Sequence, residues 1–457
     1  METLKHDIPL RAVKLLNAFL MTLVFAGCWY GYYAQRTAQP FYAKGNWLMI
    51  ALFLIIYVTY GKVYDAFLVS LNRISEMVYS QSLAALISDS ILYVVTWLLS
   101  KHLPNVLPIF FVFALQILVA VLWSVFAHRW YFATYSPKKT MIVYDTRKGM
   151  DSLISEYGLE KKFSIQKTVN VGDCLKDIQM LDEYETVFLS GIHSHDRNII
   201  LKHCIDKGII MYVIPRVGDV LMSSARQMHM FHLPILRVNR YNPSPEYIFM
   251  KRLMDIIASG IALILLCPIM FITAIAIKAT DGGPVFYRQI RLTKDGKTFN
   301  VLKFRSMRVD AEKDGVARLS TGSADDRITP IGKFIRKVRI DELPQLVNIL
   351  SGDMTIVGPR PERPEIAARY MEEMPEFSLR LQAKAGLTGY AQVYGKYNTT
   401  PYDKLQMDLM YIAHPSLVED LRIMFATVKI LFMPESTEGV AEGQTTAIQR
   451  KDEISLQ

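Results

Sequence analysis

The chain has 457 residues, 51% of them hydrophobic, and a formal net charge of +9. This length indicates several domains, and the apolar content predicts membrane segments. The positive charge suits anionic lipid headgroups and phosphate-bearing substrates. Because no finger or RNA-binding motif accompanies it, we expect no nucleic-acid partner. The four cysteines have no CxxC spacing, so we expect free thiols and neither a zinc site nor a structural disulfide.

Four apolar segments occupy the first 135 residues, at about 11–33, 45–61, 82–100 and 105–127. Each approaches the length that crosses a bilayer. Lysine and arginine are concentrated before the first segment, between the second and third, and after the fourth, which predicts that both ends of the group face the cytoplasm. We therefore expect residues 1–135 to form a four-helix transmembrane bundle. The first segment lacks a convincing cleavage site, so we expect it to be retained.

Residues 136–240 alternate short β-branched runs with helical segments. The predicted strands are 141–145, 163–169, 186–192 and 209–215. This alternation predicts a small cytoplasmic domain with a Rossmann-like parallel sheet. The sequence after the first strand, DTRKGMDSL, contains no GxGxxG loop, and we attribute the YxxxK spacing of Tyr157 and Lys161 to chance. We expect a regulatory or oligomerisation module.

The segment 241–280 contains an apolar run, Ile256 to Ile277, long enough to cross a membrane. Basic residues flank both of its ends, which favours the cytoplasmic face for both. Pro268 lies in the middle of the run and disfavours a continuous straight helix. From the residues alone, a fifth transmembrane span and a re-entrant hairpin are equal alternatives.

Residues 281–435 read as a globular domain. Tyr287 to Phe304 alternates around Lys294–Lys297, which predicts a β-hairpin. A polar segment over 310–327 predicts a mobile loop. Helices are expected near 364–373, 403–413 and 417–432; the last two are apolar enough for either core packing or the membrane interface. The polar tail, 436–457, is expected to be disordered.

The central stretch, Arg336–Arg363, reads RKVRIDELPQLVNILSGDMTIVGPRPER and contains two adjacent acids among four arginines. We predict a helix over about 342–350, with Pro344 tolerated in its first turn. Asp341 would then lie at or beside the N-cap, where its pKa would be low. Carboxylates among guanidiniums suit a phosphate ester handled with a divalent cation. The alternative is that Asp341 caps a core helix and the arginines only solvate the surface.

This stretch resembles the signature of the bacterial sugar transferases, the polyprenyl-phosphate hexose-1-phosphate transferases, also called monotopic phosphoglycosyl transferases. Four further motifs occur in the family's order: KRLMDIIAS (Lys251–Ser259), GGPVFYRQIR (Gly282–Arg291), FNVLKFRSM (Phe299–Met307) and GLTGYAQVYG (Gly386–Gly395). The four apolar segments resemble those of the large subgroup. The resemblance implies a re-entrant helix hairpin broken at Pro268 and a mainly α catalytic domain with a small β-hairpin. Small members have Ser-Pro at this break, whereas this chain has Cys267-Pro268.

The resemblance also implies the reaction. A sugar 1-phosphate, commonly of glucose or galactose, would pass from a UDP-sugar to undecaprenyl phosphate with release of UMP, at the cytoplasmic face of the bacterial inner membrane. Such a step initiates capsule, exopolysaccharide or O-antigen synthesis. Asp341 would be the nucleophile of a covalent phosphosugar intermediate, and Glu342 would hold Mg²⁺. The expected phosphate-binding residues are Arg336, Arg360, Lys303 and Arg305; nucleotide or sugar binding is expected of Gln392 and Arg363.

Two other functions are alternatives to this one. A membrane-anchored nucleotide-sugar dehydratase or epimerase would need the glycine loop that residues 136–240 lack. A polysaccharide-assembly scaffold with an inactive carboxyl domain would not need the Asp341–Glu342 pair and its arginines. Membrane lipids are expected partners, and a homodimer is compatible with the sequence. The sequence determines neither the UDP-sugar nor the polymer.

Overall fold

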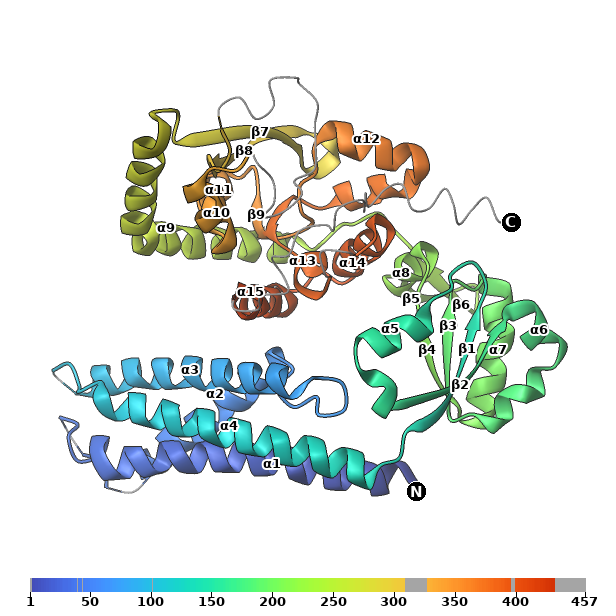
Figure 1. Ribbon diagram of the computed structural model, residues 1–457, viewed down its shortest axis with the longest axis horizontal. Coiled ribbons are helices and arrows are strands. Elements are labelled where there is room, and N and C mark those ends of the chain that lie inside the picture. The colour runs from blue at the N-terminus through green and yellow to red at the C-terminus, as the bar shows by residue number, and fades with distance from the viewer. Residues whose placement is uncertain are drawn as a thin grey trace. The chain divides into compact units, whose positions relative to one another are not determined.

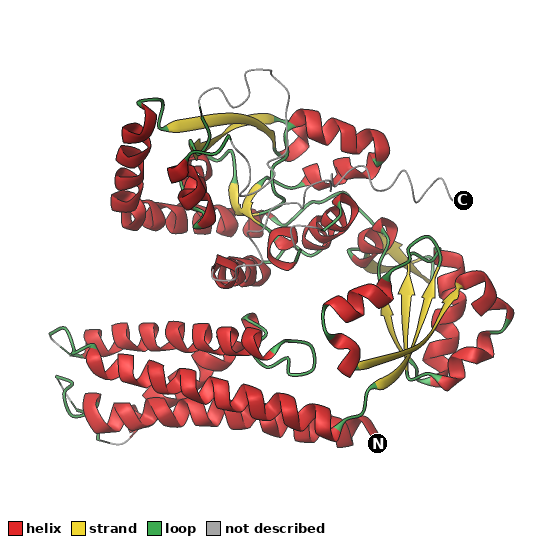
Figure 2. Cartoon of the chain, viewed as in Figure 1, coloured by secondary structure: helices red, strands yellow, loops and turns green. Residues whose placement is uncertain are grey.

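The computed structural model describes residues 2–38, 40–42, 44–100, 102–308, 327–395 and 399–431. The chain divides into two compact units, Met1–Ile214 and Pro215–Gln457. Figure 1 labels the elements of each unit, and Figure 2 distinguishes helices from strands. Most of the polar segment 310–327 and all of the tail 436–457 lie outside the described residues.

Four long apolar helices begin the first unit. They are α1 (Glu2–Cys28), which continues as a π-helical turn, η1 (Trp29–Tyr33), α2 (Lys44–Val63), α3 (Ile74–Leu99) and α4 (Leu107–Thr134). Each is long and apolar enough to cross a membrane, and each packs against two of the others. The outward apolar side chains are exposed, while polar groups pair inside: Asn17 Nδ2 donates to Gln81 Oε1 over 2.9 Å, and Tyr57 donates to Asn17 Oδ1 over 2.7 Å. Helices that meet in lipid are commonly joined by such interior hydrogen bonds.

A four-stranded parallel sheet completes this unit, in the order β2-β1-β3-β4. Its strands are β1 (Lys138–Tyr144), β2 (Phe163–Asn170), β3 (Thr186–Ser190) and β4 (Ile210–Val213). The helical segments between them are α5 (Met150–Glu156), η2 (Leu159–Lys161), α6 (Val171–Lys176), η3 (Ile178–Glu183) and α7 (Ser194–Lys207). Because side chains alternate along a strand, β1 buries Met141 and Val143 in one cluster and Ile142 in another. All four cysteines are free.

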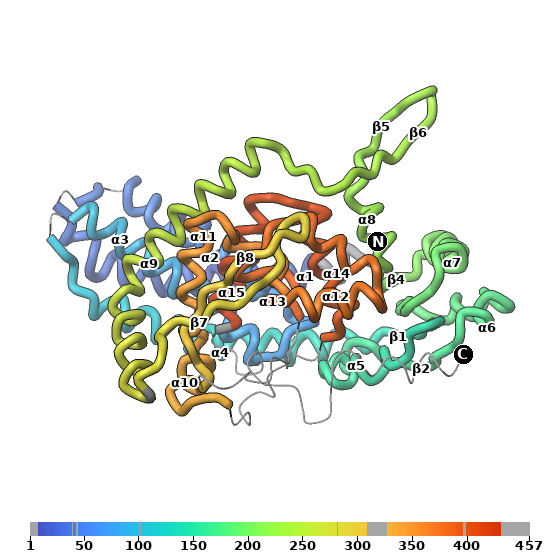
Figure 3. The backbone as a smooth tube through the Cα atoms, turned by 90° about the horizontal axis from the view of Figure 1, so that it is seen from above, coloured from blue at the N-terminus to red at the C-terminus, as the bar shows by residue number. Residues whose placement is uncertain are grey.

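The second unit begins before residue 240, the predicted end of the preceding domain. Its first elements are α8 (Val217–Ser223) and the hairpin β5 (Arg226–Met230)–β6 (Leu233–Arg237). Val220 is buried in the main core of this unit, and α8 packs against α14 (Pro401–Ala413). Residues 215–223 are therefore part of the compact second unit. Figure 3 shows the β5–β6 hairpin extending away from the elements around it.

Helix α9 (Pro245–Asp281) follows and is the fifth helix long and apolar enough to cross a membrane. Ser244 caps it by accepting from the Tyr247 amide, and Gly282 ends it at φ +70°, a left-handed conformation that favours glycine. The helix changes direction sharply within its length (Figures 1 and 3). Pro268, inside it, removes one backbone hydrogen bond and accounts for such a bend.

The rest of the unit begins with the predicted hairpin, β7 (Phe286–Leu292) and β8 (Thr298–Phe304), joined by η4 (Lys294–Gly296). The elements after it are α10 (Pro330–Lys337), η6 (Ile340–Glu342), α11 (Gln345–Ser351), β9 (Thr355–Val357), α12 (Pro364–Glu373), η7 (Pro375–Gln382), β10 (Gly386–Thr388), α13 (Tyr390–Tyr394), α14 and α15 (Leu417–Leu431). Strands β9 and β10 pair in parallel.

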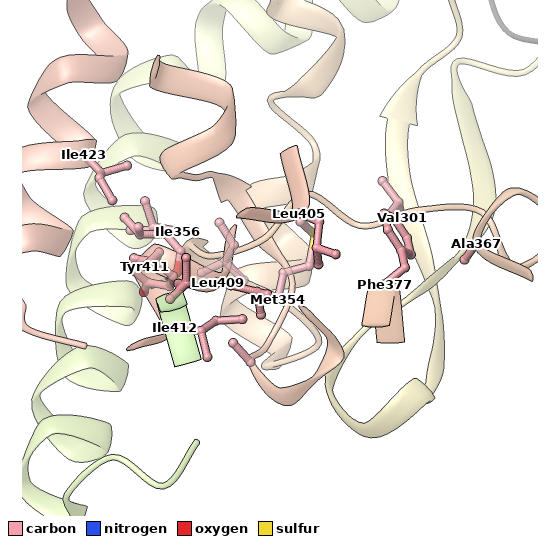
Figure 4. Close-up of a cluster of buried hydrophobic side chains, with 14 of the residues drawn as sticks. Val301, Met354, Ile356, Ala367, Phe377, Leu405, Leu409, Tyr411, Ile412 and Ile423 are labelled. Carbon is pink, nitrogen blue, oxygen red and sulfur yellow. Dashed lines mark hydrogen bonds between the residues drawn. The ribbon is translucent and has the colours of Figure 1, made fainter. Parts of the chain in front are cut away.

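The core of this part joins distant segments of the chain. It includes Val301, Met354, Leu409 and Ile423 (Figure 4). Helix α14 contributes four buried apolar residues to it, which favours the core alternative for this helix. Helix α15 buries Ile423 but leaves Val418 77% exposed, so one face of it remains uncovered.

Candidate active site

The two adjacent acids lie in a tight turn between α10 and α11. Thr329 caps α10 by accepting from the Gly332 amide. After this helix, Arg339 adopts φ +59°, a left-handed conformation that is uncommon for a residue other than glycine. Strained backbone of this kind is concentrated at functional sites. Arg339 directly precedes the turn η6, which contains Asp341 and Glu342.

The predicted N-cap at Asp341 is wrong. Helix α11 begins at Gln345, and the capping position is taken by Pro344, which makes no side-chain cap. A 3₁₀ turn, η6, lies between, closed by the Leu343 amide donating to the Ile340 carbonyl over 3.1 Å. The reason is local: Pro344 has no N–H to make the α-helical bond to Ile340, so the turn closes one residue earlier.

Glu342 is held by two cations from different elements. Lys303 on β8 lies 3.0 Å from Glu342 Oε1, and Arg360 lies 2.8 Å from the same oxygen. The carboxylate side chain is only 13% exposed. Burial alone would raise the pKa of Glu342, but Arg360 and Lys303 outweigh it and hold the pKa well below its usual range. Glu342 is therefore a fixed negative charge.

Asp341 behaves in the opposite way. It is 9% exposed, and burial, reinforced by the neighbouring Glu342 charge, raises its pKa above the usual 3.8. Lys303, Arg336 and Arg339 oppose this shift. The prediction that its pKa is low is therefore wrong, because the carboxylate is buried beside a like charge instead of exposed at a helix terminus.

Lys303 and Arg360 thus contact Glu342, and the charge of Arg336 acts to lower the pKa of Asp341. Burial lowers the pKa of Lys303, against the opposing charge of Glu342, while Glu342 raises the pKa of Arg360. The three side chains come from β8, from α10 and from the loop after β9. Cations converging on a buried carboxylate pair form a surface suited to a phosphate group.

Three other predicted residues occupy the following places in the unit. The Arg305 guanidinium packs where a side chain at Gly283 would lie, near the end of α9. Arg363 is the residue that precedes α12. Gln392, on α13, donates to the Leu387 carbonyl over 3.3 Å, and its Oε1 is buried without a partner among the described residues. An orphaned buried acceptor of this kind fits a site that takes a ligand or an ordered water.

A network of charged side chains that contacts the backbone at Arg360 and Pro361 was not predicted from the sequence. Arg380 is 6% exposed, and its Nη2 lies 2.6 Å from Asp408 Oδ2. The same nitrogen donates to the Arg360 carbonyl over 2.9 Å. Arg291, whose pKa burial lowers to about 10, donates to the Pro361 carbonyl over 3.0 Å. The sequence offers one indication of this network: Asp408 is an acid within the mainly apolar helical stretch LQMDLM.

The site offers few donors for a metal. Among the residues that the structure describes, no three His, Cys, Asp or Glu side chains lie close enough to hold an ion. Mg²⁺, however, commonly uses one or two carboxylates and takes its remaining ligands from water and substrate phosphates. Glu342, the predicted metal ligand, fits that smaller donor set.

Comparison with known proteins gives consistent matches. The family model described as bacterial sugar transferase matches residues 246–434. A UDP-N-acetylgalactosamine-undecaprenyl-phosphate N-acetylgalactosaminephosphotransferase of Aeromonas hydrophila is 38% identical over 234 residues, 50% of this chain and 54% of that protein. UDP-glucose:undecaprenyl-phosphate glucose-1-phosphate transferases of Klebsiella pneumoniae and Caulobacter vibrioides are 37% and 38% identical. These two matches cover 51% and 41% of this chain. The chain thus spans about half the length of the first two relatives, 54% of each, and 71% of the third.

Proposed function

Because the chain belongs to the bacterial sugar transferase family, we propose that it transfers a sugar 1-phosphate from a UDP-sugar to undecaprenyl phosphate and releases UMP. The observation that carries the proposal is the buried Asp341–Glu342 pair beside Lys303 and Arg360. Its two pKa values are shifted in opposite directions. Such divergence is typical of paired acids with different chemical roles.

In the proposed first step, a carboxylate oxygen of Asp341 attacks the phosphorus that carries the sugar. The bond to the bridging oxygen breaks, and UMP leaves with that oxygen. An acyl phosphate between Asp341 and the sugar phosphate results. An oxygen of the lipid phosphate then attacks the same phosphorus, which yields the lipid diphosphate sugar and restores the Asp341 carboxylate. The raised pKa of Asp341 supports its role, because a more basic carboxylate is a stronger nucleophile.

The cations around the pair would bind the phosphates. Arg360 and Lys303 already contact a carboxylate oxygen, and Arg336 lies near enough to Asp341 to affect its pKa. We propose that these three hold the diphosphate and neutralise charge on the leaving UMP. Glu342 would hold Mg²⁺, which when bound supplies further neutralisation of phosphate charge. Gln392 and Arg363 remain our candidates for nucleotide or sugar binding, and Arg305 remains a candidate for phosphate binding.

We propose that the protein resides in the bacterial inner membrane with its catalytic domain on the cytoplasmic face. The first four apolar helices would form a transmembrane bundle, and the parallel sheet after them a Rossmann-like cytoplasmic module. Helix α9, with basic residues near both ends and Pro268 inside, would enter and leave on one face. This arrangement would hold the site at the headgroup plane, where the phosphate of a membrane-embedded prenyl lipid lies.

The sugar is proposed only as a hexose or an N-acetylated hexose. The relatives' names include both glucose and N-acetylgalactosamine. The product would initiate a capsule, exopolysaccharide or O-antigen.

The proposal is tested with purified protein in vesicles, assayed for UMP release from a panel of UDP-sugars. We expect release from at least one of them that requires both undecaprenyl phosphate and Mg²⁺. Conversion of the sugar itself with bound NAD would instead indicate a dehydratase or epimerase. No turnover of any UDP-sugar, by a protein that is folded and inserted, would favour the scaffold alternative.

A further inference from the structure

The loop that carries Arg360 is fixed at four consecutive carbonyls. Pro359 accepts from the Gly386 amide over 2.9 Å, and Glu362 accepts from the Leu292 amide over 2.9 Å. Between them, the carbonyls of Arg360 and Pro361 accept from arginine side chains, Arg380 and Arg291. Prolines at two of these positions also restrict the backbone. With its backbone fixed in this way, Arg360 donates a side-chain hydrogen bond to Glu342.

Arg380 is oriented chiefly by Asp408, and its Nη1 also lies 3.7 Å from Glu362 Oε1 in the same loop. Its Nε and Nη2 both contact Asp408 Oδ2, at 2.9 and 2.6 Å, and both side chains are almost fully buried. Its guanidinium also lies over the Phe377 ring, 4.9 Å from the centroid. A buried ion pair is frequently no more stabilising than apolar residues of the same size. Its presence is better explained by the contacts that Arg380 makes with the Arg360 loop, a hydrogen bond to the Arg360 carbonyl and an ion pair with Glu362.

We propose that Arg380, oriented by Asp408, is a positioning residue that fixes the Arg360 loop and so aims the Arg360 guanidinium at the reacting phosphates. The path is continuous: Asp408 to Arg380, Arg380 to the Arg360 carbonyl, and the Arg360 side chain to Glu342. The role of Arg360 toward phosphate rests on the proposed function. The positioning of the loop does not.

The positioning is tested by hydrogen exchange on the full chain in nanodiscs. Asp408→Asn keeps the side-chain size but removes the charge. Arg380→Lys keeps the charge but removes the guanidinium, which donates to Asp408 and to the Arg360 carbonyl at the same time. We expect at least tenfold faster exchange at the Leu292 and Gly386 amides, which donate to this loop. Asp420→Asn is the matched control, because it breaks another buried ion pair of the same unit, 2.9 Å from Lys251. Unchanged exchange in both loop variants overturns the proposal, whatever the enzyme's activity.

A double-mutant cycle tests the link to chemistry. We expect Asp408→Asn to lower kcat/KM for the UDP-sugar by about 10- to 100-fold, as for a displaced binding group. In the Arg360→Ala background, Asp408→Asn should lower kcat/KM by less than about threefold, because the guanidinium that it positions is absent. Asp420→Asn should lower kcat/KM by the same factor in the wild-type and Arg360→Ala backgrounds. Equal losses for Asp408→Asn in the two backgrounds would show a general structural role and refute the proposal. If no variant or wild type turns over while exchange changes as expected, the proposed function fails and the positioning stands.

Discussion

Asp341 and Glu342 are adjacent acids that the fold places in different electrostatic surroundings. Glu342 contacts Lys303 and Arg360 directly, which keeps it ionised. Asp341 is buried beside that fixed charge, which makes its carboxylate more basic. One-residue spacing cannot give both side chains the same direction, so they contribute differently. The pair supplies a reactive carboxylate next to a permanently charged one.

Glu342→Gln should therefore impair catalysis without abolishing the nucleophile. We expect kcat for UMP release to fall by about 10² or more, as for loss of one electrostatic stabiliser. Glu365→Gln, in the first turn of α12, is a control that should retain activity. Near wild-type turnover in Glu342→Gln would contradict the role given to this carboxylate.

Variants of the charged neighbours of Asp341 should shift the pH profile of the remaining activity, in a direction set by the charge that is removed. Asp341 must be ionised to attack, so kcat/KM falls as the pH falls through its pKa, which lies above 3.8. The charge of Glu342 raises that pKa, so Glu342→Gln should move the acid limb to lower pH. The charge of Lys303 lowers it, so Lys303→Met should move the limb to higher pH. Shifts of the same sign in both variants would show that the limb does not report Asp341.

Among the secondary-structure elements, those set by local sequence were predictable. Alternation around Lys294–Lys297 predicted the β7–β8 hairpin, which is confirmed. The predicted start of the helix at residue 342 is wrong. The observed start depends on the absence of an N–H at Pro344 and on the positive φ of Arg339. The Arg380–Asp408 pair could not be predicted, because it joins η7 to α14 through tertiary packing. Lys303, Arg360 and Glu342 could be grouped from the sequence because they fall in motifs, and the structure places them in contact; the roles given to them stay predictions.

Helix α9 carries a prediction of its own about topology. If it enters and leaves on one face, residues before and after it share a compartment. Single cysteines at Arg237 and Glu373, in a cysteine-free background, flank the helix and are exposed in the unit that contains it. We expect an impermeant thiol reagent to label neither in intact spheroplasts and both after permeabilisation. Labelling of Glu373→Cys alone in intact cells would establish a complete fifth crossing.

At the scale of the whole molecule, the division at Pro215 predicts which truncation retains function. The middle region lacks a dinucleotide loop, and the proposed chemistry uses residues of the second unit only. A chain beginning at Pro215 should therefore insert and release UMP. A chain beginning at Arg240 lacks α8, which buries Val220 in the catalytic core, and should lose thermal stability. A well-inserted Pro215 chain with no turnover would show that the first unit is needed for catalysis.

The central claim, that Asp341 forms a covalent bond to the sugar phosphate, is tested most directly by trapping that species. Wild type, Asp341→Asn and Glu342→Gln are each incubated with UDP-[³H]sugar and Mg²⁺ without the lipid acceptor, and protein-bound label is measured. We expect label on the wild type that undecaprenyl phosphate chases into lipid, none on Asp341→Asn, and a reduced amount on Glu342→Gln. Label that persists on Asp341→Asn, or a wild type that turns over without ever carrying label, would contradict the covalent route and favour direct attack by the lipid phosphate.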